Sequence, residues 1–168
     1  MLAVSTSPII ARYLDNVPAV SISFWRMTFG ALILWGISLI KKQIPLKNDN
    51  LKRTIIAGIL LGIHFALFFG SIKLTTIANA TFLGTLAPLF TFSIEKFILK
   101  RNHSLGLLLG LGLAICGAII IVGNRFDFSS NYTIGNLLAV ACSIFLGIGF
   151  IISAKVRKEV DTISYSRT

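Results

Sequence analysis

Long apolar blocks alternate with short polar stretches along the chain. Six blocks can be delimited, at residues 1–14, 19–40, 54–72, 77–94, 105–122 and 134–154. A helix rises about 1.5 Å per residue, and the hydrocarbon core of a bilayer is about 30 Å thick. The last five blocks therefore have enough residues to span a membrane as helices. The first block reaches only about 21 Å, and Arg12 interrupts its end. We expect the N-terminal part of this helix to be missing from the sequence.

The composition supports a membrane protein. The chain has 168 residues, of which 55% are hydrophobic and 13% are charged. Soluble domains carry roughly 25% charged residues, and disordered segments are poor in apolar ones. An ordinary soluble enzyme and a disordered tail are therefore excluded. The sequence predicts an all-α multi-pass membrane protein with about six transmembrane helices, the first one short.

The charge is distributed unevenly between the two sides of the predicted bundle. The net charge is +10, and 12 of the 16 Lys and Arg residues follow the second, fourth and sixth blocks. The opposite side carries only Arg12, Lys73 and Arg125. Because basic loops face the cytoplasm, we expect both chain ends in the cytoplasm and residues 15–18 outside, in a bacterial-type inner (plasma) membrane. The basic clusters lack interleaved aromatic residues, so no nucleic-acid partner is expected.

Several polar side chains fall inside the apolar blocks. Arg26 and His64 are ionisable, and such residues usually face the interior of a helix bundle or a water-filled cavity. Arg26, His64, Thr85 and Ser143 all lie roughly 11 to 15 Å below a membrane surface, by the rise of a helix. Four polar groups from four helices at one depth are typical of the binding level of a transporter.

The fourth block carries a polar face and a helix breaker. Thr81, Thr85 and Glu95 share this face with Pro88, which removes a backbone donor and predicts a local break. We take His64, Thr81, Thr85 and Ser143 as candidate substrate-binding residues that line a cavity. Arg26 and Glu95 are candidate structural or gating charges.

Each of these residues also has a simpler interpretation. Thr85 and Ser143 could bond carbonyls of their own helices, and His64 could be a hydrogen-bonded structural residue. Arg26 could extend toward a membrane surface or bond backbone carbonyls. Glu95 lies at a helix end, where an ion pair with neighbouring loop residues is the simpler role.

Small residues form stripes on two of the blocks. Gly58, Gly62, Ala66 and Gly70 recur every four residues in the third block, and the fifth block carries Gly106, Gly110 and Gly117. In lipid such stripes allow close helix contact, so we expect packing seams.

Catalysis, metal binding and a cofactor are not expected. His64 and His103 lie at different depths, and no block contains an aspartate that could serve as a catalytic partner. Cys116 and Cys142 lie inside apolar blocks without a CxxC pattern and are interpreted as small apolar filler. The chain also lacks a GxxxxGK[ST] nucleotide-binding loop. We therefore expect a protein that is not an enzyme.

Four segments together resemble a known family. VSISFWRMTFGALIL resembles the second helix of EamA-type transporters, in the drug/metabolite transporter superfamily. GIHFALFFGSIKLTTIANATFLGTLAPLFTFSIEKFIL is similar to their third and fourth helices, and GLLLGLGLAICGAIIIV to their glycine-rich fifth helix. GNLLAVACSIFLGIGFIISAK resembles the start of the second repeat. The resemblance covers residues 17 to 123 best.

The resemblance implies a ten-helix carrier built from two inverted five-helix repeats. Residues 1–123 would form the first repeat, with its first helix incomplete. Residues 124–168 would form an outer loop, the sixth helix and a cytoplasmic tail that begin the second repeat. The leading hypothesis is a fragment of a carrier that moves a small metabolite or drug-like compound by alternating access. The alternatives are a half-size transporter that acts as a homodimer and a membrane scaffold that transports nothing.

Overall fold

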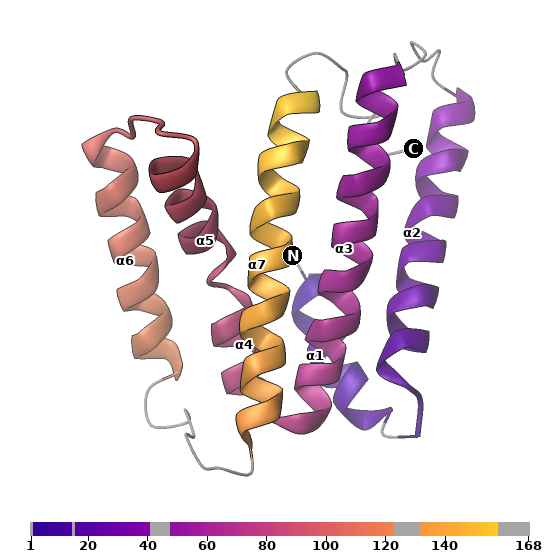
Figure 1. The fold of residues 1–168 in the computed structure, drawn as a ribbon. Helices are drawn as coiled ribbons and strands as arrows, with labels where there is room; N and C mark the ends of the chain where they lie inside the picture. The colour runs from indigo at the N-terminus through magenta and orange to yellow at the C-terminus, as the bar shows by residue number, and fades with distance from the viewer. Residues whose placement is uncertain (1, 15, 41–47, 123–131, 158–168) are drawn as a thin grey trace.

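The computed structural model describes residues 2–14, 16–40, 48–122 and 132–157, and every regular element within these ranges is helical. In chain order the elements are α1 (Leu2–Tyr13), α2 (Ala19–Ile40), α3 (Asn48–Leu74), α4 (Ile77–Gly84), α5 (Ala87–Ser93), the π-helix η1 (Ile94–Ile98), α6 (Leu105–Val122) and α7 (Thr133–Val156). The long helices run side by side with their axes roughly aligned (Figure 1). The predicted all-α class is confirmed.

Four segments are long and apolar enough to cross a membrane. They cover Ala19–Ile37, Asp49–Leu74, Ile77–Ile98 and Thr133–Val156. Among the described residues a shorter apolar helix covers Leu105–Gly117, and α1 has only 12 residues. The chain is therefore a multi-pass membrane protein, and in the part of it that the structure describes four of the six predicted spans reach the length of a full crossing.

Helices α3 and α7 form the centre of the bundle. Figure 1 shows α2 beyond α3 on one side, and α4, α5 and α6 beyond α7 on the other. Close approach around α7 requires glycine: a Cβ atom at Gly135 would lie 2.6 Å from the backbone carbon of Leu74, and one at Gly147 would lie 3.1 Å from the carbonyl oxygen of Ala87. Small residues permit such contact between membrane helices. α7 thus packs directly on the backbone of its neighbours.

The fourth predicted span is interrupted. α4 ends at Gly84 and α5 begins at Ala87, with Pro88 in the first turn of α5. Proline has no N–H group, so it is tolerated at this position but interrupts a continuous helix. α7 binds both sides of the interruption. Ser143 donates to the carbonyl of Leu83 in α4. On the other side Gly147 packs against α5, where Thr91 Oγ1 donates to the carbonyl of Ala87 at 2.9 Å and lies 3.3 Å from that of Gly147.

A second set of contacts joins α1 to α3. Arg12 donates to the backbone carbonyls of Ile72 and Thr75 near the end of α3. Lys73 donates to the carbonyl of Leu14 at 2.8 Å. Phe69 and Ile72 are fully buried beside Ala11 and Ala80 in the main apolar cluster. The short first helix is thus fixed at one end of the bundle.

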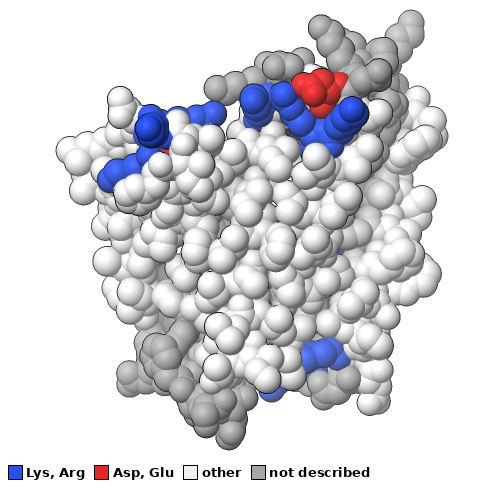
Figure 2. Space-filling model, viewed as in Figure 1, with Lys and Arg blue, Asp and Glu red and all other residues white. Residues whose placement is uncertain are grey.

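Charged side chains gather at the two ends of the helices. One end, called the basic end below, contains the start of α3, the end of α7 and the segment after η1. Among the described residues it carries Lys52, Arg53, Lys96, Lys100, Arg101, Lys155 and Arg157. The other end carries Arg12 and Lys73. Figure 2 shows basic residues along the upper edge, few at the lower edge, and a band between them almost without charge.

Candidate functional site

A groove of about 770 Å³ lies between α2, α3 and α7. Its wall is mainly apolar and small, with a few polar side chains. The polar residues are Arg26, Thr54, Ser153 and Arg157; the aromatic residues are Phe65, Phe145 and Phe150; the glycines are Gly30, Gly58 and Gly149. From Arg26 to Leu34 on α2 the groove extends about 12 Å along the helix axis, toward the basic end.

Arg26 marks the deep end of the groove. It is the eighth residue of α2 and is half-buried. Its Nη1 atom donates to Ser7 Oγ at 2.5 Å. Its guanidinium carbon lies 4.5 Å from the centre of the Phe65 ring and 5.9 Å from that of Phe69. No ion pair within the described part of the chain includes Arg26. The cation therefore rests on aromatic faces rather than on a carboxylate.

The other end of the groove opens at the basic end of the bundle. Arg157 is exposed there, at the last turn of α7. Thr54 Oγ1 donates to the carbonyl of Asn50 at 2.8 Å. Among the described residues the lining contains two cations, Arg26 and Arg157, and no Asp or Glu. The groove is thus an apolar space with positive charge at both ends.

His64 and Ser143 lie elsewhere, in the contact between α3, α4 and α7. His64 Nδ1 is 2.9 Å from the carbonyl oxygen of Cys142, and since a carbonyl only accepts, Nδ1 carries the proton. The ring also stacks on Phe68, with centroids 6.1 Å apart. Ser143 is fully buried and donates to Leu83 of α4 rather than to its own helix. Neither residue lines the groove.

Thr81 and Thr85 are exposed on the interrupted helix. Thr81 Oγ1 donates to the carbonyl of Ile77 at 2.6 Å, and Thr85 Oγ1 donates to that of Phe82 at 2.7 Å. Both hydroxyls thus bond their own helix, and neither residue is part of the groove lining. Contact between a substrate and His64, Thr81, Thr85 or Ser143 stays a prediction.

A polar cluster that the sequence did not single out joins the same helices. Asn136 Oδ1 of α7 accepts from Thr75 Oγ1 at 2.8 Å and from Asn79 Nδ2 at 3.0 Å. Thr75 and Asn79 are buried. Thr75 lies just before α4 and Asn79 in its first turn, four residues later. Two polar residues at this helical spacing are the signal that could have revealed them. We call the set Thr75, Asn79, Asn136, His64 and Ser143 the α7 junction.

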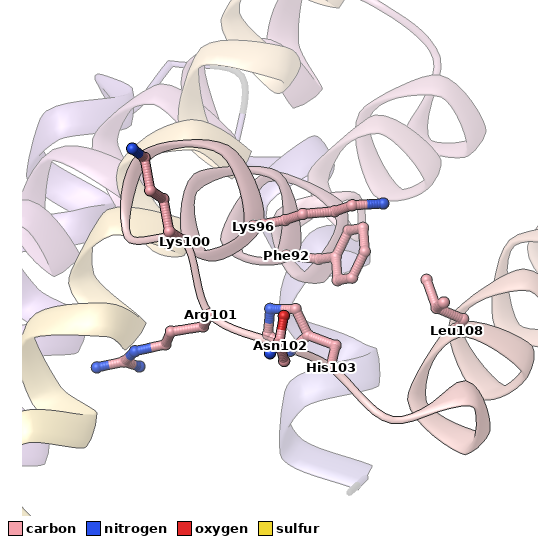
Figure 3. Close-up of a pocket in the computed structure, with 7 residues that line it drawn as sticks. All are labelled: Phe92, Lys96, Lys100, Arg101, Asn102, His103 and Leu108. Atoms are coloured by element: carbon pink, nitrogen blue, oxygen red, sulfur yellow. The ribbon is translucent and has the colours of Figure 1, made fainter.

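Glu95 lies at the basic end, in η1. Arg101 donates to its Oε1 at 2.5 Å, and His103 Nε2 lies 3.8 Å from its Oε2. A pocket of about 380 Å³ beside it is lined by Phe92, Lys96, Lys100, Arg101, Asn102, His103 and Leu108. In Figure 3 Lys96 extends toward α6 alongside Phe92, whereas Lys100 and Arg101 extend the other way. The basic side chains therefore do not converge on one point.

The described residues hold no group of three or more His, Cys, Asp or Glu side chains that could bind a metal ion. Cys142 is buried, Cys116 is exposed, and both are free thiols. The groove is the arrangement best suited to hold a small molecule, since ligand sites are concave, mostly apolar spaces of about 300–1,000 Å³ with a few polar groups.

Comparison with known proteins gives three relatives. The transporter YyaM of Bacillus subtilis (strain 168), itself described as uncharacterized, is 29% identical in an alignment 103 positions long that covers 58% of this chain and 33% of that protein. Solute carrier family 35 member G1 of Mus musculus is 25% identical in an alignment 169 positions long that covers 94% of this chain and 46% of the relative. The Homo sapiens protein of the same name matches to the same extent. The chain spans a third to a half of the length of these relatives, and no solved structure matches it.

The family assignment rests on a longer match. The sequence profile of the EamA-like transporter family matches residues 1–123, from α1 through α6. This region includes two of the three helices that line the groove and all of the interrupted helix. Because the match covers well over half of the chain, the protein belongs to the EamA-like transporter family, in the drug/metabolite transporter superfamily.

Proposed function

We propose that the protein is a secondary carrier that moves a small metabolite or drug-like compound across the plasma membrane. The observation that carries this proposal is the groove between α2, α3 and α7, because its volume suits a small molecule. It also places a cation, Arg26, inside a spanning helix, where ionisable residues mark substrate pathways. Membership of a transporter family supports the same conclusion.

The proposed carrier has ten helices in two inverted five-helix repeats. Residues 1–123 form the first repeat, and residues 124–168 begin the second. The packing of α7 supports this division, since the helix assigned to the second repeat lies against α3, α4 and α5 of the first. In such carriers substrates bind at the interface between repeats, and the groove lies between α7 and two helices of the first repeat.

The basic end of the bundle faces the cytoplasm in this proposal. Lys and Arg gather there (Figure 2), as the positive-inside rule requires. The end of α7 is then cytoplasmic, and the groove opens inward past Arg157. We propose the same side for the N-terminal end of the chain. Alternating access requires a second state in which the solute leaves on the other side, and Pro88 marks the place where the fourth span can bend.

The predicted site residues receive separate roles. His64 and Ser143 hold α7 in place as one wall of the groove, through their bonds to Cys142 and to Leu83. Thr81 and Thr85 have no role in the groove itself. They contact a substrate only if its path also runs between the interrupted helix and the second repeat. Glu95 acts as a structural charge through its pair with Arg101.

The experiment blocks the groove with a bulky side chain. A Cβ atom at Gly58, which lines the groove, meets no atom within 4 Å, and the same holds for Gly110 on α6. Gly58→Trp and Gly110→Trp are therefore matched, because neither new Cβ atom meets a described atom and only the first position lies in the groove. The variants are compared by uptake of a labelled metabolite mixture into proteoliposomes that contain the protein from its complete gene.

We expect Gly58→Trp to reduce uptake at least tenfold at normal membrane abundance, and Gly110→Trp to leave it unchanged. Equal uptake by both variants would exclude the groove as the solute path. No uptake of any compound by the unmodified protein would exclude the carrier and favour a membrane scaffold.

A further inference from the structure

The charges in the groove indicate which class of solute it takes. Resting on the proposed function, we infer that the solute is an organic anion with a carboxylate and an apolar, often aromatic, body, and that Arg26 binds the carboxylate. The positive charge comes from Arg26 at the deep end and Arg157 at the mouth, and none of the lining residues that the structure describes is acidic.

Arg26 carries a positive charge that no described acidic group neutralises. An arginine inside a spanning helix is costly and normally pairs with an acid or with backbone carbonyls. Arg26 does neither within the described chain: its guanidinium donates to Ser7 and lies over the rings of Phe65 and Phe69. The positive charge is therefore held in place but not neutralised. An anionic ligand would supply the missing charge partner.

The geometry of the guanidinium is the second argument. Arginine has five N–H donors in one plane, and among the described residues Ser7 is its only hydrogen-bond acceptor here. The guanidinium carbon lies over the Phe65 ring, 4.5 Å from its centre, and a phenyl ring accepts no conventional hydrogen bond, so further N–H donors stay available for a ligand. A carboxylate binds the edge of a guanidinium through two parallel hydrogen bonds. A lysine would offer a point charge without this fork.

The apolar lining supplies the third argument. Phe145 and Phe150 of α7 and Met27 and Leu34 of α2 line the groove between the two cations. A ligand that places its carboxylate on Arg26 lays the rest of its structure against these side chains. Arg157 at the mouth attracts the same ligand from the cytoplasm, because exposed charge raises the local concentration of counter-ions. Cations are repelled by both arginines, and a neutral amide leaves Arg26 without a charge partner.

The test measures ligand-induced thermal stabilisation of the protein, purified from its complete gene. The probes are matched pairs of the same shape: phenylacetate with phenylacetamide, and indole-3-acetate with indole-3-acetamide. Phenyl phosphate represents the other common anion. The variants are Arg26→Gln, Arg26→Lys and the control Arg53→Gln, which removes an arginine that pairs with Asp49 outside the groove.

We expect the carboxylates to stabilise the protein and the amides to have no effect. Arg26→Gln should weaken carboxylate binding at least tenfold, Arg26→Lys should weaken it less, and Arg53→Gln should not change it. If Arg26→Gln fails to fold, the carboxylate–amide comparison on the unmodified protein and Arg26→Lys still decides the question.

Three results would overturn the inference: equal binding of amides, full carboxylate binding by Arg26→Gln, or stabilisation by phenyl phosphate without stabilisation by the carboxylates. Uptake of neutral solutes that Gly58→Trp blocks, with no effect of any anion, would leave the carrier intact and reject only the anionic substrate. Failure to transport any compound would reject the proposed function itself.

Discussion

Two regions of the bundle place polar side chains inside spanning helices, and they do so in opposite ways. In the α7 junction, buried polar groups pair with one another or with backbone carbonyls, as in the contacts of Asn136 with Thr75 and Asn79. In the groove between α2, α3 and α7, Arg26 keeps an unneutralised charge beside open space. The first arrangement stabilises helix contacts, and the second leaves a positive charge and N–H donors for a ligand.

The difference shows why polarity and depth alone do not define a site in a membrane protein. His64 is polar and lies at the expected depth, but its Nδ1–H group already donates to the carbonyl of Cys142. Substitutions in the α7 junction should therefore change stability, whereas substitutions around Arg26 should change binding. The predictions for the contacts of α7 and for Arg26 test that separation, a prediction for Glu95 gives a reference outside both regions, and thermal unfolding of the purified protein in detergent is the common measurement.

The largest effect is expected at Gly135. A Cβ atom there would lie 2.6 Å from the backbone carbon of Leu74, and the backbone cannot move aside without separating α7 from α3. Gly135→Ala should destabilise the protein by about 3 kcal/mol, the upper range for overpacking. The control is Gly110→Ala, where no atom lies within 4 Å of the new Cβ. Equal unfolding midpoints for the two variants would show that α7 does not pack as described.

The next effect is expected at Asn136. Asn136→Leu removes the oxygen that accepts from Thr75 and Asn79, both of which are buried. Loss of this acceptor should cost about 2 kcal/mol, within the range for a buried polar group that loses its partner. Asn102→Leu, on an exposed residue, serves as the control. An unchanged midpoint for Asn136→Leu would contradict a structural role for the α7 junction.

A smaller effect is expected at His64. His64→Phe retains an aromatic ring against Phe68 but removes the N–H group that bonds the carbonyl of Cys142. We expect a loss of about 1 kcal/mol, the net value of one hydrogen bond, and an unchanged KM for transport. A large increase in KM at unchanged stability would instead make His64 a substrate-binding residue, as the sequence first suggested.

Glu95 should contribute less than His64. Its partner Arg101 is half-exposed, and exposed ion pairs contribute roughly 0.2–1 kcal/mol. Glu95→Gln should lower the midpoint slightly in low salt and by less in 0.5 M salt, where the screening length falls to about 4 Å. An equal loss at both salt concentrations would indicate a role beyond this ion pair.

The smallest effect on stability is expected at Arg26. Arg26→Met loses the contact with the Phe65 ring and the bond to Ser7, but it also removes the cost of holding a charge inside the bundle. These terms oppose each other, so the net change should stay below about 1 kcal/mol. A severe loss of stability would identify Arg26 as a structural anchor and remove the contrast between the two regions.

Most of the fold was predictable because lipid imposes length and polarity on helices. The blocks at residues 19–40 and 105–122 coincide with α2 and α6. The block at 54–72 was too short, since α3 begins at Asn48 with a polar turn that an Asp49–Arg53 ion pair stabilises. Hydropathy assigns that turn to a loop. Similarly, η1 continues the fourth span to Ile98, past the first charged residues.

The groove was less predictable. Arg26 stood out as an ion in an apolar block, but Phe65, Phe145 and Gly149 are residue types that occur throughout membrane helices. Their convergence depends on how α2 and α7 sit on α3, which is a tertiary property. The small stripes illustrate the same limit of pattern analysis. A Cβ atom at Gly70 would lie 3.7 Å from Leu138 Cδ1 of α7, whereas no described atom lies within 4 Å of a Cβ at Gly58, which lines the groove, or at Gly110 on α6.

The interruption between α4 and α5 has a mechanical consequence. α7 contacts both sides of it: Ser143 donates to the carbonyl of Leu83 in α4, and Gly147 packs against Ala87 and Thr91 of α5. Because one continuous helix contacts both short helices, α5 cannot swing relative to α4 while both contacts persist. Any such swing must therefore either carry α7 along or break one of these contacts. In both cases movement in the fourth span is transmitted to a wall of the groove.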